Sequence, residues 1–325
     1  QDPWVRVGPV SPARIANYPS IAWTGSEIGL AGGLYNTIDG MYLILETMSV
    51  ETLGTGSADQ IMQIEVGLRP SLAWSGGGFA MAWEYSQDPT WNEVRFAPWN
   101  ESGPNPWPGA PVSAEDQWAT DAKAVWNGSG YGIAWTDDAT GEWAVRFARV
   151  DEAGGITGPY TVYSGAGTTS SLPSLAWDGS GYGTVWLELD EDLTRIAFAR
   201  VAADGTPEGD AVPLTEFRAW QERPAIAWAG SAFAVVWDER VEVDGYLRIK
   251  LSLLTPAGSR VGSDVVLDEP GATSEEFWPS VAWGGCEIGV AWHSGGWHLD
   301  GDYGQMTFAR VTAEVFGPGA PELVC

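Results

Sequence analysis

Four aromatic residues and a recurring set of carboxylates are the side chains whose types and spacing suit chemistry on a ligand. Tyr18 and Trp278 directly precede a short segment that recurs along the chain, and Trp118 and Trp220 each lie eight residues before its Trp. Exposed Trp and Tyr rings stack on sugars or anchor protein partners. We therefore predict that Tyr18, Trp118, Trp220 and Trp278 form a ligand-binding face; the alternative is that they only cap structural units.

Carboxylates follow the second apolar run of most recurring segments, and we expect them in loops on the same face as the four aromatic residues. Oxygen-rich loops of this kind suit calcium. The nearest approach to a calcium loop is Asp300-Gly-Asp302, which lacks the third Asp or Asn and the distal Glu. One hypothesis is calcium bound by Asp300 and Asp302; the other is solvated charge paired with arginines. The other acidic residues of these loops are Glu84, Asp88, Asp137, Asp138, Glu142, Glu188, Asp190, Glu191, Asp192, Asp238, Glu239, Glu242 and Asp244.

The sequence offers little specific support for catalysis. Two carboxylates suffice for glycoside hydrolysis, but 43 acidic residues make a pair easy to find. There is no phosphate-binding Gly-Lys-Ser/Thr loop and no His-Glu-x-x-His, Gly-x-Ser-x-Gly or Cys-x-x-Cys motif. His293 and His298 lie beside the two Asp residues, but their spacing has little specificity for a metal. If the chain is an enzyme, we expect its chemistry in the insertion from His293 to Tyr303, which interrupts the repeat.

The elements that position these residues follow from a repeat. Its clearest copy runs from Pro173 to Trp186, and the first Trp of this copy occurs six times, at intervals of 51, 52, 51, 51 and 55 residues. A Gly turn between two apolar runs predicts a hairpin, and later runs such as Ile196–Val201 and Asp210–Leu214 predict a third and a fourth strand. Four short strands per repeat, with no helical period, predict an all-β fold: a six-bladed β-propeller of four-stranded antiparallel blades. The alternatives are another number of blades and a β-solenoid.

We predict a single propeller domain over residues 1–325. Residues 4–10 suit a closing fourth strand, and so do residues 321–325, so the closing segment stays open. The paired Trp residues of the first and second strands are expected to be wedges in the core between blades. The predicted repeats are approximately residues 19–69, 70–120, 121–172, 173–223, 224–278 and 279–325.

The hairpin from Pro173 to Trp186, with an Ala-Arg-Val-x-x-Asp-Gly third strand after it, resembles the propeller-forming repeats of large secreted bacterial proteins. The resemblance covers residues 4–325. It implies a propeller scaffold and export from a bacterial cell. Because such repeats identify a scaffold, the resemblance implies no particular activity.

Composition excludes several classes of partner. The formal net charge of −27 disfavours nucleic acid, whose phosphates would be repelled. No apolar run approaches the length of a membrane span, so we expect no membrane insertion. The start at Gln-Asp-Pro-Trp fits removal of a signal segment and therefore an extracellular or cell-surface protein. Cys286 and Cys325 form either a disulfide that pins the chain end or two separate thiols.

The main functional prediction is a secreted or cell-surface binding module without catalysis. Its partner is expected to be a glycan or an extracellular protein, with a carbohydrate as the first choice. One alternative is a structural module that assembles with copies of itself. A second alternative is a polysaccharide-active enzyme that uses central carboxylates.

Overall fold

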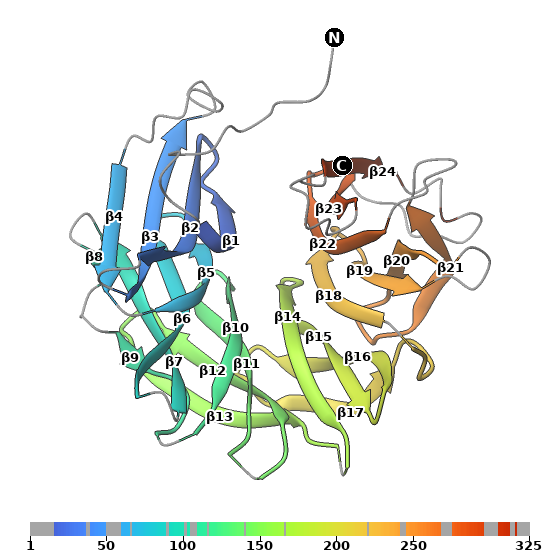
Figure 1. Ribbon diagram of the computed structural model, residues 1–325, viewed down its shortest axis with the longest axis horizontal. Coiled ribbons are helices and arrows are strands. Elements are labelled where there is room, and N and C mark those ends of the chain that lie inside the picture. Colours follow the sequence, from blue (N-terminus) through green and yellow to red (C-terminus); the bar gives the residue numbers. More distant parts are fainter. Residues whose placement is uncertain are drawn as a thin grey trace. The chain divides into compact units, whose positions relative to one another are not determined.

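The computed structural model describes residues 16–36, 40–49, 60–65, 67–88, 91–100, 103–104, 109–115, 117–139, 141–165, 167–219, 221–240, 245–267, 275–295, 305–312 and 316. All of its named elements are β-strands (Figure 1), so the all-β prediction is confirmed. Within these residues no helix has the length and apolarity of a membrane span.

The strands pair with their neighbours in sequence to form antiparallel sheets, most of them four-stranded, as the repeat predicts. The first three sheets are formed by β1 (Ala16–Trp23), β2 (Glu27–Asn36), β3 (Gly40–Ser49) and β4 (Gln60–Glu65); by β5 (Leu68–Trp74), β6 (Phe79–Asp88), β7 (Trp91–Asn100) and β8 (Gly103–Pro104), with β9 (Ala110–Pro111) also on β7; and by β10 (Ala119–Trp126), β11 (Gly130–Asp137), β12 (Ala144–Asp151) and β13 (Ile156–Tyr163).

The other three sheets follow the same order. They are formed by β14 (Thr169–Trp177), β15 (Gly181–Asp190), β16 (Leu193–Ala202) and β17 (Pro207–Pro213); by β18 (Gln221–Trp228), β19 (Phe233–Arg240), β20 (Leu247–Leu254) and β21 (Arg260–Leu267); and by β22 (Glu276–Trp283), β23 (Ile288–Ser294) and β24 (Gln305–Val311). The sixth sheet has three strands among the described residues.

The chain divides into two compact units. The first comprises residues 1–139 and 148–159, and the second residues 140–147 and 160–325, so the boundary between them falls within the third sheet. Residues 4–10 and 321–325, the two candidates for a closing strand, lie outside the described residues.

Each first strand contains a β-bulge at the same place in the repeat. In β18, Glu222 lies opposite Asp238 and Ala225 lies opposite Val236, so Arg223 and Pro224 are the bulged residues. Proline suits a bulge because it has no N–H to donate. The first bulged residue, which we call the bulge residue, has a left-handed backbone with φ of 46–61° in all six sheets; it precedes a proline in five of them and Ala122 in the third. The six bulge residues are Tyr18, Arg69, Asp121, Leu172, Arg223 and Trp278.

The second-strand tryptophans form the core, as predicted. Trp83, Trp135, Trp186 and Trp237 are fully buried. The first-strand tryptophans differ from the prediction, because they are only partly buried and Trp23 is 51% exposed. They stand at the end of the first strand beside the hairpin turn, where most pack on one aromatic ring of the second strand. These pairs are Trp74–Phe79, Trp126–Tyr131, Trp177–Tyr182 and Trp228–Phe233, with ring centroids 4.7–4.9 Å apart.

The serine of the recurring Pro-Ser pair joins successive sheets, which explains why it recurs. Its hydroxyl oxygen accepts a hydrogen bond from a backbone N–H of the next first strand. The bonds are Leu72 N to Ser20 Oγ (2.9 Å), Ala124 N to Ser71 Oγ (3.0 Å) and Ile226 N to Ser174 Oγ (3.3 Å). Lys123 occupies the position of this serine in the third repeat.

Candidate functional site

Two positions of the repeat bring polar side chains together: the bulge residue of the first strand and the residue after the buried Trp of the second strand. Glu84, Thr136, Asp238 and His293 occupy the second of these positions. Seven of the acids expected in loops lie within β6, β11, β15 and β19, so that prediction is wrong for them. Five of these are buried, namely Glu84, Asp137, Glu188, Asp238 and Glu239, and the other two are Asp88 and Asp190. The second strands continue beyond the Trp, so these acids face the neighbouring strands.

In the first unit, Glu84 is a buried carboxylate with several hydrogen-bond donors around one oxygen. Its Oε1 accepts hydrogen bonds from Arg69 Nη1 (3.1 Å), Thr120 Oγ1 (2.5 Å) and the backbone N–H of Asp121 (2.8 Å). Arg69 Nη1 also lies 3.5 Å from Asp121 Oδ1. The guanidinium lies over the ring of Tyr18, 5.0 Å from its centroid. Three bulge residues, Tyr18, Arg69 and Asp121, are thus held in one cluster by Glu84.

Lys123 stands beside this cluster. Its side chain is exposed, but surrounding protein atoms lower the pKa of its amino group, against the opposing effect of Asp121 and Glu84. The positive charge of Arg69 lowers this pKa further. Among the described residues, no hydrogen bond or ion pair is formed by the Lys123 ammonium group.

In the second unit, Asp238 occupies the repeat position of Glu84 and, like Glu84, accepts a hydrogen bond from the backbone N–H of the next bulge residue, here Trp278. Asp238 is 1% exposed, and its Oδ1 accepts no hydrogen bond among the described residues. Burial and then the charge of Glu222 raise the pKa of Asp238 to about 7, although the backbone of Trp278 and the charge of Arg223 oppose them. Asp238 is therefore a carboxyl group that holds a proton near neutral pH.

Glu222 lies directly opposite Asp238 in the register of β18 and β19. Its side chain is 40% exposed, and its Oε2 lies 3.8 Å from Nε of Arg223, the bulge residue. The Arg223 guanidinium lies 4.7 Å from the ring centroid of Trp278, the next bulge residue, and the Trp278 side chain is 42% exposed. A buried acid and an exposed acid thus stand together beside an exposed cation and an exposed indole.

An aromatic group backs Trp278. The Trp278 ring packs edge-on against the Phe277 ring, with centroids 5.2 Å apart. The His293 ring stacks on the Phe277 ring at a centroid distance of 4.7 Å. Burial lowers the pKa of His293, so this imidazole is neutral near pH 7. Its buried Nδ1 accepts or donates no hydrogen bond within the described part of the chain. The group fixes the position of Trp278 by packing.

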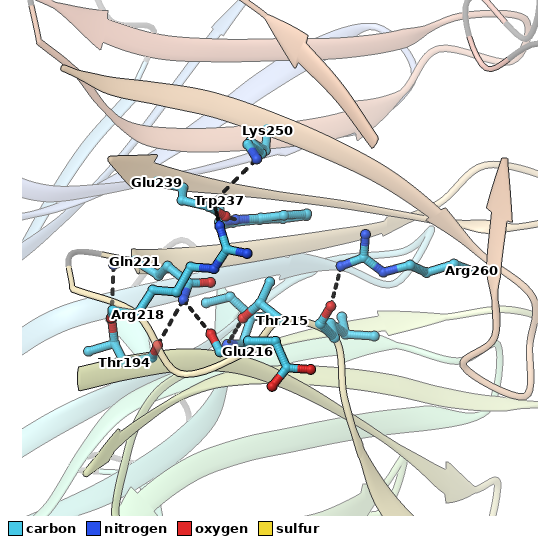
Figure 2. A network of polar contacts seen from close by, with 11 residues as sticks. Thr194, Thr215, Glu216, Arg218, Gln221, Trp237, Glu239, Lys250 and Arg260 are labelled. Atoms are coloured by element: carbon cyan, nitrogen blue, oxygen red, sulfur yellow. Dashed lines mark hydrogen bonds and ion pairs between the residues drawn. The ribbon is translucent and has the colours of Figure 1, made fainter. Parts of the chain in front are cut away.

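A buried polar network anchors the start of β18 (Figure 2). Gln221 Nε2 donates to the carbonyl oxygens of Thr194 and Glu216, each at 2.8 Å, and Gln221 N donates to Thr194 Oγ1 at 2.9 Å. On the facing strand, Glu239 accepts hydrogen bonds from Trp237 Nε1 (3.0 Å) and Lys250 Nζ (3.2 Å). These contacts hold the residues on either side of the Glu222–Asp238 pair.

Three of the four aromatic residues predicted to bind a ligand lie among the described residues. Tyr18, Trp118 and Trp278 are exposed, at 48%, 39% and 42%. Tyr18 and Trp278 are bulge residues, whereas Trp118 lies three residues before the bulge residue Asp121, where its backbone N–H donates to Asp138 Oδ1. Trp220 lies outside the described residues. Their role as ligand contacts stays a prediction.

The calcium and disulfide predictions stay untested. Asp300, Asp302 and Cys325 lie outside the described residues, and Cys286 is exposed. In the part of the chain that is described, no group of three or more His, Cys, Asp or Glu side chains is arranged to hold a metal ion.

Sequence reasoning missed Arg69, Asp121, Lys123 and Arg223. A signal for the two arginines was present, because each directly precedes the proline of a repeat, as Tyr18 does. Lys123 was visible as the replacement of a recurring serine. Nothing in the sequence distinguishes Asp238 from Glu84 as the candidate acid, since both directly follow a Trp.

No family model matches the sequence, and no curated protein matches it. Among solved structures, the fold is similar to a subtype N10 neuraminidase-like protein of A/little yellow-shouldered bat/Guatemala/060/2010, with a TM-score of 0.58 and 9% identity over 92% of this chain and 95% of that one. It is also similar to a subtype N11 neuraminidase-like protein of A/flat-faced bat/Peru/033/2010 (TM-score 0.54, 9% identity, 91% and 86% covered). A third match is the hemagglutinin-neuraminidase ectodomain of parainfluenza virus 5 (TM-score 0.50, 9% identity, 93% and 82% covered). At these identities the likeness concerns the fold.

The matches correct two predictions. A binding module without catalysis was the main functional prediction, and no enzyme activity was expected. Both are wrong as the preferred interpretation, because the proteins of similar fold are named as neuraminidase-like proteins and as a hemagglutinin-neuraminidase. The expectation had rested on the absence of a sequence motif, and a pair of carboxylates brought together by folding needs none.

Proposed function

We propose that the chain is a carbohydrate-active enzyme that hydrolyses glycosidic bonds with the carboxylate pair Glu222 and Asp238. The observation that carries the proposal is the difference between two acids at one repeat position. Glu84 Oε1 accepts three hydrogen bonds, whereas Asp238 is buried with an Oδ1 that accepts none among the described residues and with its pKa raised to about 7. A protonated acid beside an ionised one is the arrangement that glycoside hydrolysis needs.

The two acids take different roles in this proposal. Asp238 donates its proton to the leaving oxygen of the glycosidic bond. Glu222, which is exposed and lies beside Arg223, is the carboxylate that stabilises or attacks the positive sugar carbon, and water deprotonated by Asp238 completes the hydrolysis. Residues opposite each other in an antiparallel pair have Cβ atoms about 5 Å apart, which favours the short carboxyl separation of retaining enzymes. Asp238 is buried in the unliganded protein, so the exposed Arg223 side chain must move aside when substrate binds.

Activity on a panel of nitrophenyl glycosides and polysaccharides tests this function. We expect hydrolysis by the wild type and a loss of kcat by a factor of about 10²–10⁴ in Glu222→Ala. If Glu222 is the nucleophile, added azide should restore part of the activity of this variant as a glycosyl azide product. Glu208→Ala is the matched control, because Glu208 is an exposed acid paired with Arg200 at 3.7 Å, away from the bulges. A wild type that cleaves nothing in the panel, or a Glu222→Ala variant with full activity, contradicts the proposal.

Trp278 provides the sugar platform in this proposal. Its exposed ring and the neighbouring Arg223 leave an apolar face on which a pyranose can stack. We expect Trp278→Ala to raise KM about fivefold, which corresponds to the ~1 kcal/mol of such a contact, and to change kcat little. Trp23→Ala, which removes an exposed Trp at a hairpin end, should leave KM unchanged. Equal effects of the two substitutions on KM speak against a platform at Trp278.

We also propose that the six sheets are the blades of one closed six-bladed propeller. The support is the equivalence of the sheets, with the same bulge in every first strand, and the similar folds found among solved structures. Small-angle X-ray scattering of the whole chain tests it, since a compact chain of 325 residues has a radius of gyration of about 20 Å. An extracellular location and a glycan partner accord with this proposal and remain predictions.

A further inference from the structure

The hairpin turn between β10 and β11 contains the only Asn-Gly pair of the sequence, Asn127-Gly128. A hydrogen bond from Asn127 N to the carbonyl oxygen of Gly130 closes the turn at 2.9 Å, and Gly128 and Ser129 are exposed at its tip. Because glycine has no side chain, the backbone nitrogen of Gly128 can approach the side-chain amide carbon of Asn127 with little steric hindrance. The residue types at this turn therefore suit an attack of the backbone on the side chain.

The side-chain carbonyl of Asn127 is polarised by hydrogen bonds. Its Oδ1 accepts hydrogen bonds from Ser129 N (2.9 Å) and Ser129 Oγ (3.2 Å), and Arg149 Nη2 donates to Ser129 Oγ at 3.4 Å. These three residues belong to the first unit. Donors aimed at a carbonyl oxygen stabilise the negative charge that it gains when its carbon is attacked. The turn thus carries its own oxyanion donors.

The next repeat has an aspartate at the same position of the same turn, Asp178. Its Oδ1 accepts hydrogen bonds from Ser180 N (2.8 Å) and Ser180 Oγ (2.9 Å), as Asn127 Oδ1 does from its own serine. Its Oδ2 forms an ion pair with Arg200 Nη1 at 2.7 Å. Burial opposes ionisation of this carboxyl group, but hydrogen bonds from Ser180, Arg200 and Gly181 lower its pKa below the ordinary value. The fold therefore favours a carboxylate at this position of the turn.

Arg149 is the counterpart of Arg200, in the same Phe-Ala-Arg-Val run of the third repeat. Each of the two arginines donates to its turn serine through Nη2, at 3.4 and 3.2 Å. Within the described part of the chain Arg149 makes no ion pair. Since Asn127 Oδ1 is bonded as Asp178 Oδ1 is, Asn127 Nδ2 corresponds to the Asp178 oxygen that faces the arginine. An amide nitrogen cannot accept a hydrogen bond from a guanidinium, whereas a carboxylate oxygen can.

We propose that Asn127 is a site of spontaneous deamidation, and that Arg149 holds the resulting aspartate in the kind of ion pair that Asp178 makes with Arg200. The modification adds a negative charge to the turn of the third repeat and gives it the bonding of the fourth. The site is independent of the proposed hydrolysis, since it shares no residue with the Glu222–Asp238 pair.

The reaction needs only water. The Gly128 backbone nitrogen attacks the side-chain carbon of Asn127, a C–N bond forms, and the side-chain nitrogen leaves as ammonia with the proton of the Gly128 N–H. Water then opens the cyclic imide. Cleavage at the side-chain carbon restores the normal backbone and yields aspartate, whereas cleavage at the main-chain carbon yields isoaspartate, which lengthens the backbone of the turn.

Incubation of the whole folded chain at pH 8.5 and 37 °C, followed by peptide mass spectrometry, tests the modification. We expect a mass gain of about 1 Da at Asn127 that increases with time and with pH. Asn92 is the internal control, because it precedes Glu93 and should stay unmodified. In Asn127→Gln the longer side chain requires a larger ring, so residue 127 should also stay unmodified. An Asn127 that remains intact for several weeks, or equal modification of Asn92, overturns the site.

Asn127→Asp tests whether Arg149 holds the product. We expect its Tm at pH 7 to exceed that of the wild type by about 1–2 °C. An ion pair lowers the pKa of the folded-state carboxyl group, so the gain should be lost as the pH falls to about 3. The gain should also disappear when Arg149→Ala is combined with Asn127→Asp and compared with Arg149→Ala alone. A Tm no higher than that of the wild type at pH 7, or an equal gain without Arg149, overturns the role of the arginine.

Discussion

Asp238→Asn is expected to lower kcat for glycoside hydrolysis by a factor of about 10²–10⁴, because the amide cannot donate a proton to the leaving oxygen. The substitution keeps the shape of the side chain, so the Glu222 register and the packing of Trp278 should persist. KM should change little. Kinetics at the optimum pH of the wild type measures both parameters.

The same substitution should stabilise the protein, and the gain should grow with pH. The folded-state pKa of Asp238 is raised to about 7 from 3.8, so the native state holds this proton more tightly than the unfolded chain. The carboxyl group therefore opposes folding progressively as the pH rises from about 4 to 7, and fully above 7. Asn removes this effect. We expect the Tm of Asp238→Asn to exceed that of the wild type by more at pH 8 than at pH 4.

Two outcomes contradict the role assigned to Asp238. One is unchanged activity, which means that the proton comes from another group. The other is a Tm difference that is equal at pH 4 and pH 8, which means that Asp238 titrates near its ordinary pKa. If Asp238→Asn loses activity but its Tm differs from that of the wild type by the same amount at pH 4 and pH 8, Asp238 positions other groups and does not donate the proton.

Glu84→Ala is expected to destabilise the protein strongly, by about 3 kcal/mol, because it leaves buried donors without their acceptor. Three groups lose a partner at once: Arg69 Nη1, the Thr120 hydroxyl and the Asp121 backbone N–H. For a chain of this length the effect corresponds to a fall in Tm of about 4 °C. Differential scanning calorimetry measures it.

The matched control for Glu84→Ala is Glu287→Ala. Glu287 Oε2 lies 3.4 Å from Arg310, in a pair whose side chains are 40% and 71% exposed. Such a pair contributes about 0–1 kcal/mol, so the Tm should change by no more than about 1 °C. If both substitutions lower the Tm equally, Glu84 is not the centre of a buried network. Hydrolysis by Glu84→Ala should persist below its Tm, in contrast to Asp238→Asn.

The strands and their order could be predicted from the sequence with little loss. The Gly turns, the alternating apolar runs and the period near 51 residues are local signals, and the hairpins at Asn127–Gly130 and Asp178–Gly181 form as those signals indicate. The candidate site was harder to predict. The acids after the second Trp were assigned to loops because charged residues usually lie in water, but hydrogen bonds from the next sheet let Glu84 stay inside.

Sequence alone determined that this chain is an all-β repeat protein, because strand periodicity and turn chemistry depend on neighbouring residues. Tertiary structure decided which polar residues are chemically distinct. Glu84 and Asp238 both follow a Trp, yet Glu84 Oε1 accepts three hydrogen bonds, whereas Asp238 is buried with an oxygen, Oδ1, that accepts none among the described residues. The ionisation of a carboxyl group depends on such long-range neighbours and on its burial, so the acid that holds a proton emerges only when the chain has folded.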